Sequence, residues 1–320
     1  MATTAVDIID DKSPICIPFI LSRYHAYLSA SASTSTSIPA PAPTSTPNPN
    51  NNRPKRPFII GLNGVQGAGK TTLVRALARQ LRETEGLETL VCSIDDFYLR
   101  REDQQALAES HPDNLLVQVR GEPGTHDIPL AHTFFTSLCA GLPAQIPQYD
   151  KAAYSGLGDR VPSSQWTTIN GPDQPPVEVV IFEGWCVGFR SLDEGEVVRK
   201  WEDANSRTLR QHPLEHLLFV NEKLRAYDVI TDTFDAFIHI DAENTEWVYD
   251  WRLEQEAMLR RERGTGMTDE QVVKFVDAYY PAYELFSDML RNGLMPSNKP
   301  GCQLRLIVGK DRRVKQTVII

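Results

Sequence analysis

The sequence has little of what marks secreted, membrane-spanning or nucleic-acid-binding proteins. Its five cysteines are widely spaced and form no Cys-x-x-Cys pair, which argues against a disulfide framework and a zinc site. No apolar run approaches the roughly 18 residues that a membrane span needs. Lys and Arg total 33 against 42 Asp and Glu, and this net charge of −9 argues against nonspecific binding to nucleic acid or to an anionic membrane.

A secretion signal is also missing from the start of the chain. The apolar patch "CIPFIL" at residues 16–21 is short and follows Asp7, Asp10 and Asp11, where a signal peptide would carry positive charge. We therefore expect a soluble protein of the cytoplasm, with the nucleus also open. The sequence leaves the oligomeric state undecided.

Composition divides the 320 residues into three parts. Residues 29–57 are rich in Ser, Thr, Pro and Asn and offer almost nothing to bury, which is typical of a disordered linker. Before it, within residues 1–28, apolar residues recur near helical spacing and predict a short helix that docks on the main domain. Residues 58–320 have the pattern of one globular domain.

Strand and helix patterns alternate along residues 58–320. Short apolar runs rich in β-branched residues predict five buried parallel strands, at 58–63, 89–94, 177–182, 236–240 and 304–309. Helices are predicted over 71–85, near 245–263, and from a capping box that opens at Thr268 and precedes Pro281. This order predicts a doubly wound α/β fold with a mainly parallel five-stranded sheet and helices on both faces. The long, turn-rich stretch 97–176 is the expected substrate-binding insertion.

A phosphate-binding loop accounts for the glycines that follow the first strand. Residues 64–71 read "GVQGAGKT", which satisfies GxxxxGK[ST] between a predicted strand and a predicted helix. Backbone N–H groups and the helix N-terminus would bind phosphate oxygens, Lys70 would reach the outer phosphates, and the Thr71 hydroxyl would bind Mg²⁺. The predicted nucleotide-binding residues are Gly64, Val65, Gln66, Gly67, Ala68, Gly69, Lys70, Thr71 and Thr72.

Acidic residues end two further strands at the same edge of the sheet. Asp95 and Asp96 follow the second strand in "SIDDFYL", where a carboxylate could accept a proton from a hydroxyl group or hold metal; a capping or turn aspartate is the structural alternative. "VVIFEGW" at 179–185 has the form of a metal-binding strand that ends in Glu183. Its carboxylate would emerge beside the Mg²⁺ position.

Several segments together resemble one family of kinases. "SIDDFYL", "RGEPGTHD" (120–127), "PQYDKAAYSGLGDR" (147–160), "VIFEGWCVGF" (180–189), "FVNEKLRAYD" (219–228), "VYDWRLEQE" (248–256), "GMTDEQVVKFVDAYYPAYEL" (266–285) and "LRLIVGKDR" (304–312) are similar to plant-type D-glycerate 3-kinase and its fungal ATP-dependent kinase relatives. The likeness covers residues 58–320. More distantly, the DDFY and FEG pieces resemble uridine kinase, pantothenate kinase and phosphoribulokinase, which implies the P-loop NTPase fold with a lid helix.

The resemblance implies roles for particular residues. Asp95 matches the catalytic base of the uridine kinase group, with Asp96 as a metal-linked helper or substitute, and Glu183 matches an acid that helps to hold Mg²⁺. Arg252, Arg260 and Arg261 match the lid helix, where they would close on the phosphates; a solvated helix face is the alternative for them. The loop 308–314 would border the adenine.

The acceptor site is expected within the insertion. Glycerate carries one carboxylate and two hydroxyls, so guanidinium or ammonium groups would bind the former and carboxylates or a phenol the latter. Each candidate could equally fasten a long loop, and His126 fits that structural role best. The candidates are Arg120, His126, Asp127, Tyr149, Asp150, Lys151 and Arg160.

These observations predict an enzyme that transfers the γ-phosphoryl group of MgATP to a hydroxyl of a small anionic hydroxy acid, with D-glycerate as the implied acceptor. One alternative keeps the chemistry and changes the acceptor to a nucleoside, a pantothenate-like compound or another metabolite. A second alternative is a nucleotide-binding switch or a non-catalytic ATP-binding protein. Guanine recognition is disfavoured, because the nearest match to NKxD, at 298–301, lacks the aspartate.

Overall fold

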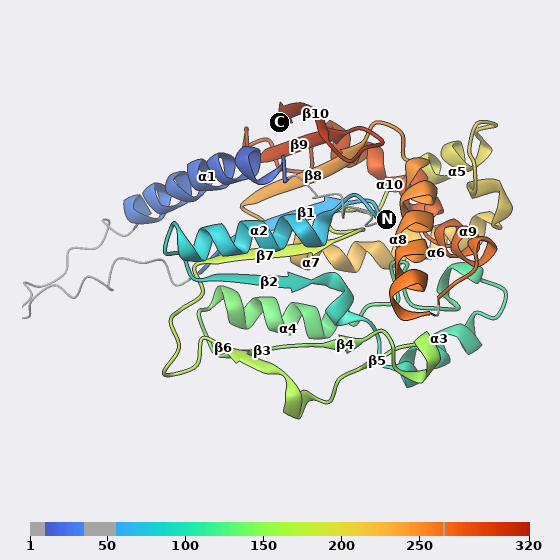
Figure 1. The fold of residues 1–320 in the computed structure, drawn as a ribbon, viewed down its shortest axis with the longest axis horizontal. Helices are drawn as coiled ribbons and strands as arrows, with labels where there is room; N and C mark the ends of the chain where they lie inside the picture. The colour runs from blue at the N-terminus through green and yellow to red at the C-terminus, as the bar shows by residue number, and fades with distance from the viewer. Residues whose placement is uncertain (1–9, 35–55, 265) are drawn as a thin grey trace, which may run out of the picture.

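The computed structural model describes residues 10–34, 56–264 and 266–320 (Figure 1). Its central sheet contains β1 (Phe58–Gly64), β2 (Thr89–Ser93), β7 (Val179–Gly184), β8 (Ala236–Ala242), β9 (Gln303–Val308) and β10 (Val314–Ile319). Their order is β10-β9-β8-β1-β7-β2, and all neighbours are parallel except β9 and β10. All five predicted strands are present.

The sixth strand, β10, is absent from the sequence prediction. Its residues are exposed or half-buried, because it is an antiparallel edge strand at the end of the sheet. A strand with so little burial has no apolar run to reveal it. By contrast, β1 and β8 lie in the middle of the sheet and are buried along their whole length.

Ten α-helices are described in these parts of the chain. They are α1 (Ser13–Thr34), α2 (Lys70–Glu83), α3 (Arg101–Ser110), α4 (Ile128–Cys139), α5 (Glu194–Glu202), α6 (Leu214–Leu224), α7 (Asp228–Thr231), α8 (Trp247–Arg263), α9 (Asp269–Asp277) and α10 (Tyr280–Asn292). Figure 1 shows α8 at the end of the sheet where β1 leads into the phosphate loop. None of the described helices is long and apolar enough to cross a membrane.

The N-terminal helix docks on the domain, as the sequence predicts, but it is longer. Ile20 and Tyr24 are buried, and the rings of Tyr24 and Tyr27 pack on Phe58 at 5.8 and 5.6 Å between centroids. The helix continues past residue 28 to Thr34, so the linker does not begin at residue 29. Alanine and serine occupy these added turns, and the Ser31 hydroxyl donates to the Tyr27 carbonyl at 2.9 Å. The rest of the predicted linker, 35–55, lies outside the described residues.

The insertion 97–176 is more ordered than its sequence indicates. It contains α3, α4 and two small hairpins, formed by β3 (Ala144–Ile146) with β6 (Thr167–Ile169) and by β4 (Tyr149–Asp150) with β5 (Asp159–Arg160). Helix α4 buries Phe134, Phe135 and Leu138 in the core. The insertion therefore shares the core of the domain.

The capping box predicted at Thr268 is present. The Thr268 hydroxyl accepts from the Gln271 N–H at 3.3 Å, and the Gln271 side chain accepts from the Thr268 N–H at 2.8 Å. The helix it opens, α9, ends at Asp277, and Pro281 lies in the first turn of α10, where a missing N–H costs nothing.

Candidate active site

The phosphate loop connects β1 to α2 as predicted. Gly67 and Gly69 have φ values of 82° and 95°, which disfavour any residue with a Cβ. At Gly67 space is also lacking, because a Cβ would lie 2.5 Å from the Cβ of Trp251 on α8. The conformation of the loop therefore requires glycine at these two positions, and at Gly67 the loop packs closely against α8.

Lys70 lies at the start of α2 with its side chain folded back on the loop. Its Nζ donates to the Gly64 carbonyl at 2.7 Å and to the Val65 carbonyl at 3.3 Å. Burial lowers the pKa of Lys70, although Glu183 and Asp95 act in the opposite direction. The ammonium group thus lies within electrostatic reach of both predicted metal-binding carboxylates.

The oxygen ligands proposed for Mg²⁺ fit that ion chemically. Thr71 is exposed at the first turn of α2, and Glu183 is half-buried near the end of β7, paired with Leu62 of β1 and Ser93 of β2. A hydroxyl and carboxylates are the ligands that Mg²⁺ prefers, and such sites use few protein groups because nucleotide phosphates and water complete them. The placement of these residues agrees with the predicted metal site, which remains a prediction.

Asp95 and Asp96 differ in what their side chains do. Both belong to the short 3₁₀ helix Ile94–Phe97, and Asp96 accepts from the Ser93 N–H at 3.2 Å within a capping box. Burial raises the pKa of Asp96 to about 6, and Asp95 and Glu183 add to this. Asp96 thus fills the structural role that was the alternative for this pair.

The two carboxylate oxygens of Asp95 differ in their partners. Its Oδ2 forms an ion pair with Lys151, and its buried Oδ1 has no hydrogen-bond partner within the described parts of the chain. Burial raises the pKa of Asp95, but Lys151 outweighs it and holds this pKa below its usual value. Tyr98 also acts on this carboxylate and favours its ionised form. Asp95 is therefore an ionised carboxylate, as a general base requires.

One predicted cation of the insertion pairs with Asp95, and a second holds the loop that carries the first. Lys151 is exposed on the loop after β4 and reaches Asp95. Arg120 donates to the carbonyls of Gly156 and Leu157, at 2.9 and 2.5 Å, and its guanidinium lies 5.6 Å from the Tyr149 ring centroid. Arg120 thus holds the loop that carries Lys151. Asp150 is exposed and accepts a local bond from the Ala152 N–H, at 2.9 Å.

Three other candidates are engaged in holding the insertion together. His126 is buried, stacks on Tyr98 at 4.4 Å, and has its Nδ1 2.7 Å from the Tyr227 hydroxyl. Burial lowers the pKa of His126 to about 4, so it is neutral at pH 7. Asp127 caps α4 through the Leu130 N–H at 3.0 Å and pairs with Arg160 at 3.0 Å. These contacts favour the structural alternative for all three.

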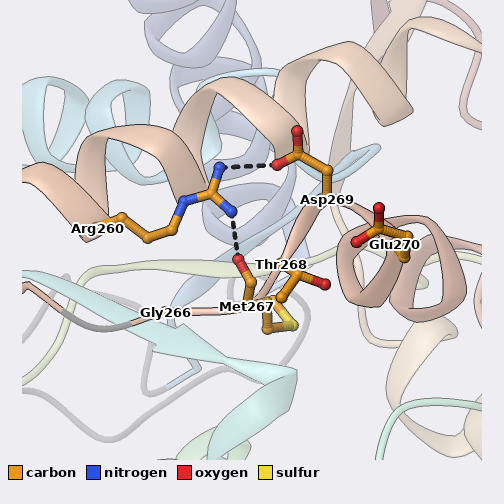
Figure 2. A pocket seen from close by; sticks show the side chains of 6 residues that line it. All are labelled: Arg260, Gly266, Met267, Thr268, Asp269 and Glu270. Carbon is orange, nitrogen blue, oxygen red and sulfur yellow. Dashed lines mark hydrogen bonds and ion pairs between the residues drawn. The ribbon is translucent and has the colours of Figure 1, made fainter.

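The lid arginines point to different partners. Arg252 lies 5.0 Å from the Phe275 ring centroid, and its buried Nε has no partner among the described residues. Arg260 donates to the Met267 carbonyl at 2.6 Å and to Asp269 at 2.7 Å, beside a surface pocket of about 330 Å³ (Figure 2). Arg261 is exposed. In this structure Arg260 holds the turn between α8 and α9, and the lid role of all three remains a prediction.

The phosphate loop has two contacts that the sequence does not predict, one of them from Arg312 in the loop 308–314, which the resemblance places near the adenine. The Tyr283 hydroxyl accepts from the Gln66 N–H of the phosphate loop at 3.2 Å, and Arg312 donates from Nε to the Gly67 carbonyl at 2.9 Å. Glu122 and Trp185 are buried, and each has polar side-chain atoms without a hydrogen-bond partner among the described residues. All four lie inside the segments that carry the family resemblance, but nothing in their local sequence distinguishes them from core or loop residues.

Comparisons with known proteins show to which family the chain belongs. A comparison with family models gives no match. An uncharacterised kinase of Schizosaccharomyces pombe is 38% identical over 261 residues, which are 80% of this chain and 90% of that protein. A probable ATP-dependent kinase of Saccharomyces cerevisiae is 35% identical over 74% of this chain and 81% of its own length. The chloroplastic D-glycerate 3-kinase of Arabidopsis thaliana is 37% identical over 72% of this chain, but the match spans only 48% of that protein.

A solved structure agrees over nearly the whole chain. The D-glycerate 3-kinase of Cryptococcus neoformans var. grubii has a TM-score of 0.80 and 32% identity, covering 96% of this chain and 99% of that one. At this coverage the match includes most of the insertion as well as the sheet. The chain therefore belongs to the family of P-loop kinases that contains D-glycerate 3-kinase and its fungal ATP-dependent kinase relatives.

Proposed function

We propose that this protein is an ATP-dependent kinase that phosphorylates the 3-hydroxyl group of D-glycerate. The observation that carries the proposal is Asp95, an ionised carboxylate that pairs with the exposed cation Lys151, lies within electrostatic reach of Lys70, and has one oxygen without a hydrogen-bond partner among the described residues. The names of the relatives supply the acceptor. We further propose that it acts in the cytoplasm.

In the proposed reaction the loop backbone and the start of α2 bind the ATP phosphates, and Lys70 moves from the loop carbonyls to the phosphate oxygens. Bound Mg²⁺ would neutralise charge on the phosphates, held by Thr71 and Glu183. Asp95 takes the proton of the acceptor hydroxyl as its oxygen bonds to the γ-phosphorus. The bond from that phosphorus to the bridging oxygen breaks, and ADP leaves with the electron pair.

The anionic acceptor needs a local cation, because the chain carries a net charge of −9. Lys151 is such a group, since its side chain is 56% exposed and its partner is the proposed base itself. In the proposed complex the carboxylate of glycerate would replace Asp95 as the ion-pair partner of the Lys151 ammonium group. This exchange would free Asp95 at the moment when the acceptor is bound.

An acceptor panel tests the function. The purified protein is given MgATP with D-glycerate, L-glycerate, pantothenate, uridine or glycerol, and the products are identified by mass spectrometry and ³¹P NMR. We expect 3-phosphoglycerate from D-glycerate and little product from the neutral acceptors. Brisk phosphorylation of another compound without turnover of glycerate would refute the acceptor and keep the kinase chemistry.

A further inference from the structure

Glu122 is a buried carboxyl group without partners. Its exposed fraction is 2%, and neither carboxyl oxygen has a hydrogen-bond partner within the described ranges. A polar group buried in this way costs free energy, and native proteins keep few of them unless water, a ligand or a function accounts for the cost. Burial alone raises the pKa of Glu122 well above its usual value.

The backbone around Glu122 is held in one conformation. Its carbonyl accepts from the Thr125 N–H at 3.1 Å and from the Thr125 hydroxyl at 2.8 Å, and that hydroxyl accepts from the Gly121 N–H at 2.9 Å. Gly121 has a φ of 151°, and a Cβ there would lie 2.7 Å from the Tyr279 ring. The backbone of this turn is thus fixed against Tyr279, which lies between α9 and α10.

The groups around Glu122 connect it to the site of reaction. Trp185 packs edge to face on Tyr279 and Tyr283, at 4.9 and 5.5 Å between centroids, and its indole N–H is also buried without a partner in the described chain. Burial raises the pKa of both tyrosines, and the charge of Glu122 contributes to each. Asp95 acts on Tyr279 as well.

Ring contacts connect these groups to the phosphate loop. Trp185 packs on Tyr283, whose hydroxyl accepts from the Gln66 N–H, and on Tyr279, whose ring lies against Gly121, the residue before Glu122. The turn that carries Glu122 and the ring of Trp185 therefore contact the same tyrosine, and Trp185 also contacts the tyrosine that binds the phosphate loop. A protonated carboxyl both donates and accepts, and an indole donates, which suits a hydroxyl group.

We propose that Glu122 determines acceptor specificity, its carboxyl group binding, together with the Trp185 indole N–H, the hydroxyl next to the one that is phosphorylated. The inference rests on the proposed function, in which that group is the 2-hydroxyl of glycerate. It accounts for a buried acid that nothing else in the described structure satisfies. A site built to bond a hydroxyl rejects analogues that lack it, because its own polar atoms are then left unpaired.

The test compares two acceptors in two proteins. D-Glycerate and 3-hydroxypropionate differ only in the 2-hydroxyl, and kcat/KM for each is measured with the wild-type protein and with Glu122→Met, which has a side chain of similar length that cannot form this hydrogen bond. We expect the substitution to lower kcat/KM for glycerate about 10- to 100-fold, the range for a lost hydrogen bond in a buried site, and to change it little for 3-hydroxypropionate. The discrimination, which is the ratio of kcat/KM for glycerate to kcat/KM for 3-hydroxypropionate, would fall by the same factor.

Two controls separate the hydrogen bond from the loss of a charge. Glu122→Gln keeps groups that donate and accept, so it should retain most of the discrimination. Glu284→Gln changes a carboxylate that accepts from the Arg207 and Thr208 N–H groups at 2.5 and 2.9 Å, and its discrimination should equal that of the wild type. The melting temperature of Glu122→Met without ligand should be at or above the wild-type value, because no hydrogen bond within the described structure is lost.

Two results would overturn the inference. An equal loss of kcat/KM for both acceptors would show a general positioning role, and a lowered melting temperature would show that Glu122 supports the fold. Failure of the proposed function is a separate result, because it appears as the absence of glycerate turnover in the wild-type protein. The melting temperature still decides the role of Glu122 in that case.

Discussion

Arg312 joins the phosphate loop to the lid helix, so Arg312→Ala should weaken both ATP binding and stability. Its Nε donates to the Gly67 carbonyl at 2.9 Å, its Nη2 pairs with Glu254 at 2.6 Å, and its guanidinium lies 5.3 Å from the Trp251 ring centroid. The Arg312 carbonyl also accepts from Lys12 at 2.6 Å, but this backbone bond survives the substitution.

The magnitude follows from these three contacts. A hydrogen bond from a charged donor contributes about 1.5–3 kcal/mol. The pair with Glu254, whose side chain is 57% exposed, adds at most about 1 kcal/mol after solvent screening, and the contact with Trp251 adds about 0.5–1 kcal/mol. Because one side chain makes all three, the contributions overlap, and we expect a total loss of about 2–3 kcal/mol in the free energy of unfolding.

The same substitution should raise the dissociation constant for MgATP about 10-fold, which corresponds to about 1.4 kcal/mol, since the Gly67 carbonyl loses the group that orients it. Urea denaturation measures the stability and isothermal titration calorimetry the affinity. Arg313→Ala is the matched control, because its side chain is exposed in the same turn. Arg312→Gly also removes the side chain, but it relieves the backbone, because the φ of 62° at this position favours glycine. Comparing it with Arg312→Ala separates the effect of the side chain from that of the backbone conformation. Equal behaviour of Arg312→Ala and Arg313→Ala would refute the reasoning.

Three further predictions concern the acids and the metal. Asp95→Asn should abolish phosphoryl transfer, with MgATP still bound in calorimetry; retained turnover would move the base elsewhere. The pKa of Asp96 is raised to about 6, so the folded protein binds its proton more tightly than the unfolded chain and loses stability as the pH rises from about 4 to 6. Asp96→Asn should therefore raise the melting temperature at pH 8 and change it little at pH 4.5; equal effects at both pH values would contradict this. EDTA should stop turnover and added Mg²⁺ restore it, whereas unchanged rates in EDTA would exclude the metal role of Thr71 and Glu183.

Local sequence patterns predict the phosphate loop, the parallel strands and the candidate base. The spacing of Gly64, Gly67 and Gly69 before Lys70 predicts the phosphate loop, because glycine and the following helix act within a few residues of chain. Short apolar runs predict the five parallel strands, since a buried strand must be apolar along its own length. Asp95 could be selected because it follows directly after such a strand.

Tertiary structure decided the rest, because burial and partners of a side chain come from segments that are distant in sequence. Arg312 meets Gly67 across 245 residues, and Lys151 meets Asp95 across 56. Glu122 is unremarkable in "RGEPGTHD" until the fold encloses its carboxyl group among aromatic rings of other elements. Local sequence can specify a loop or a strand, whereas the free energy of a charge depends on everything that packs around it.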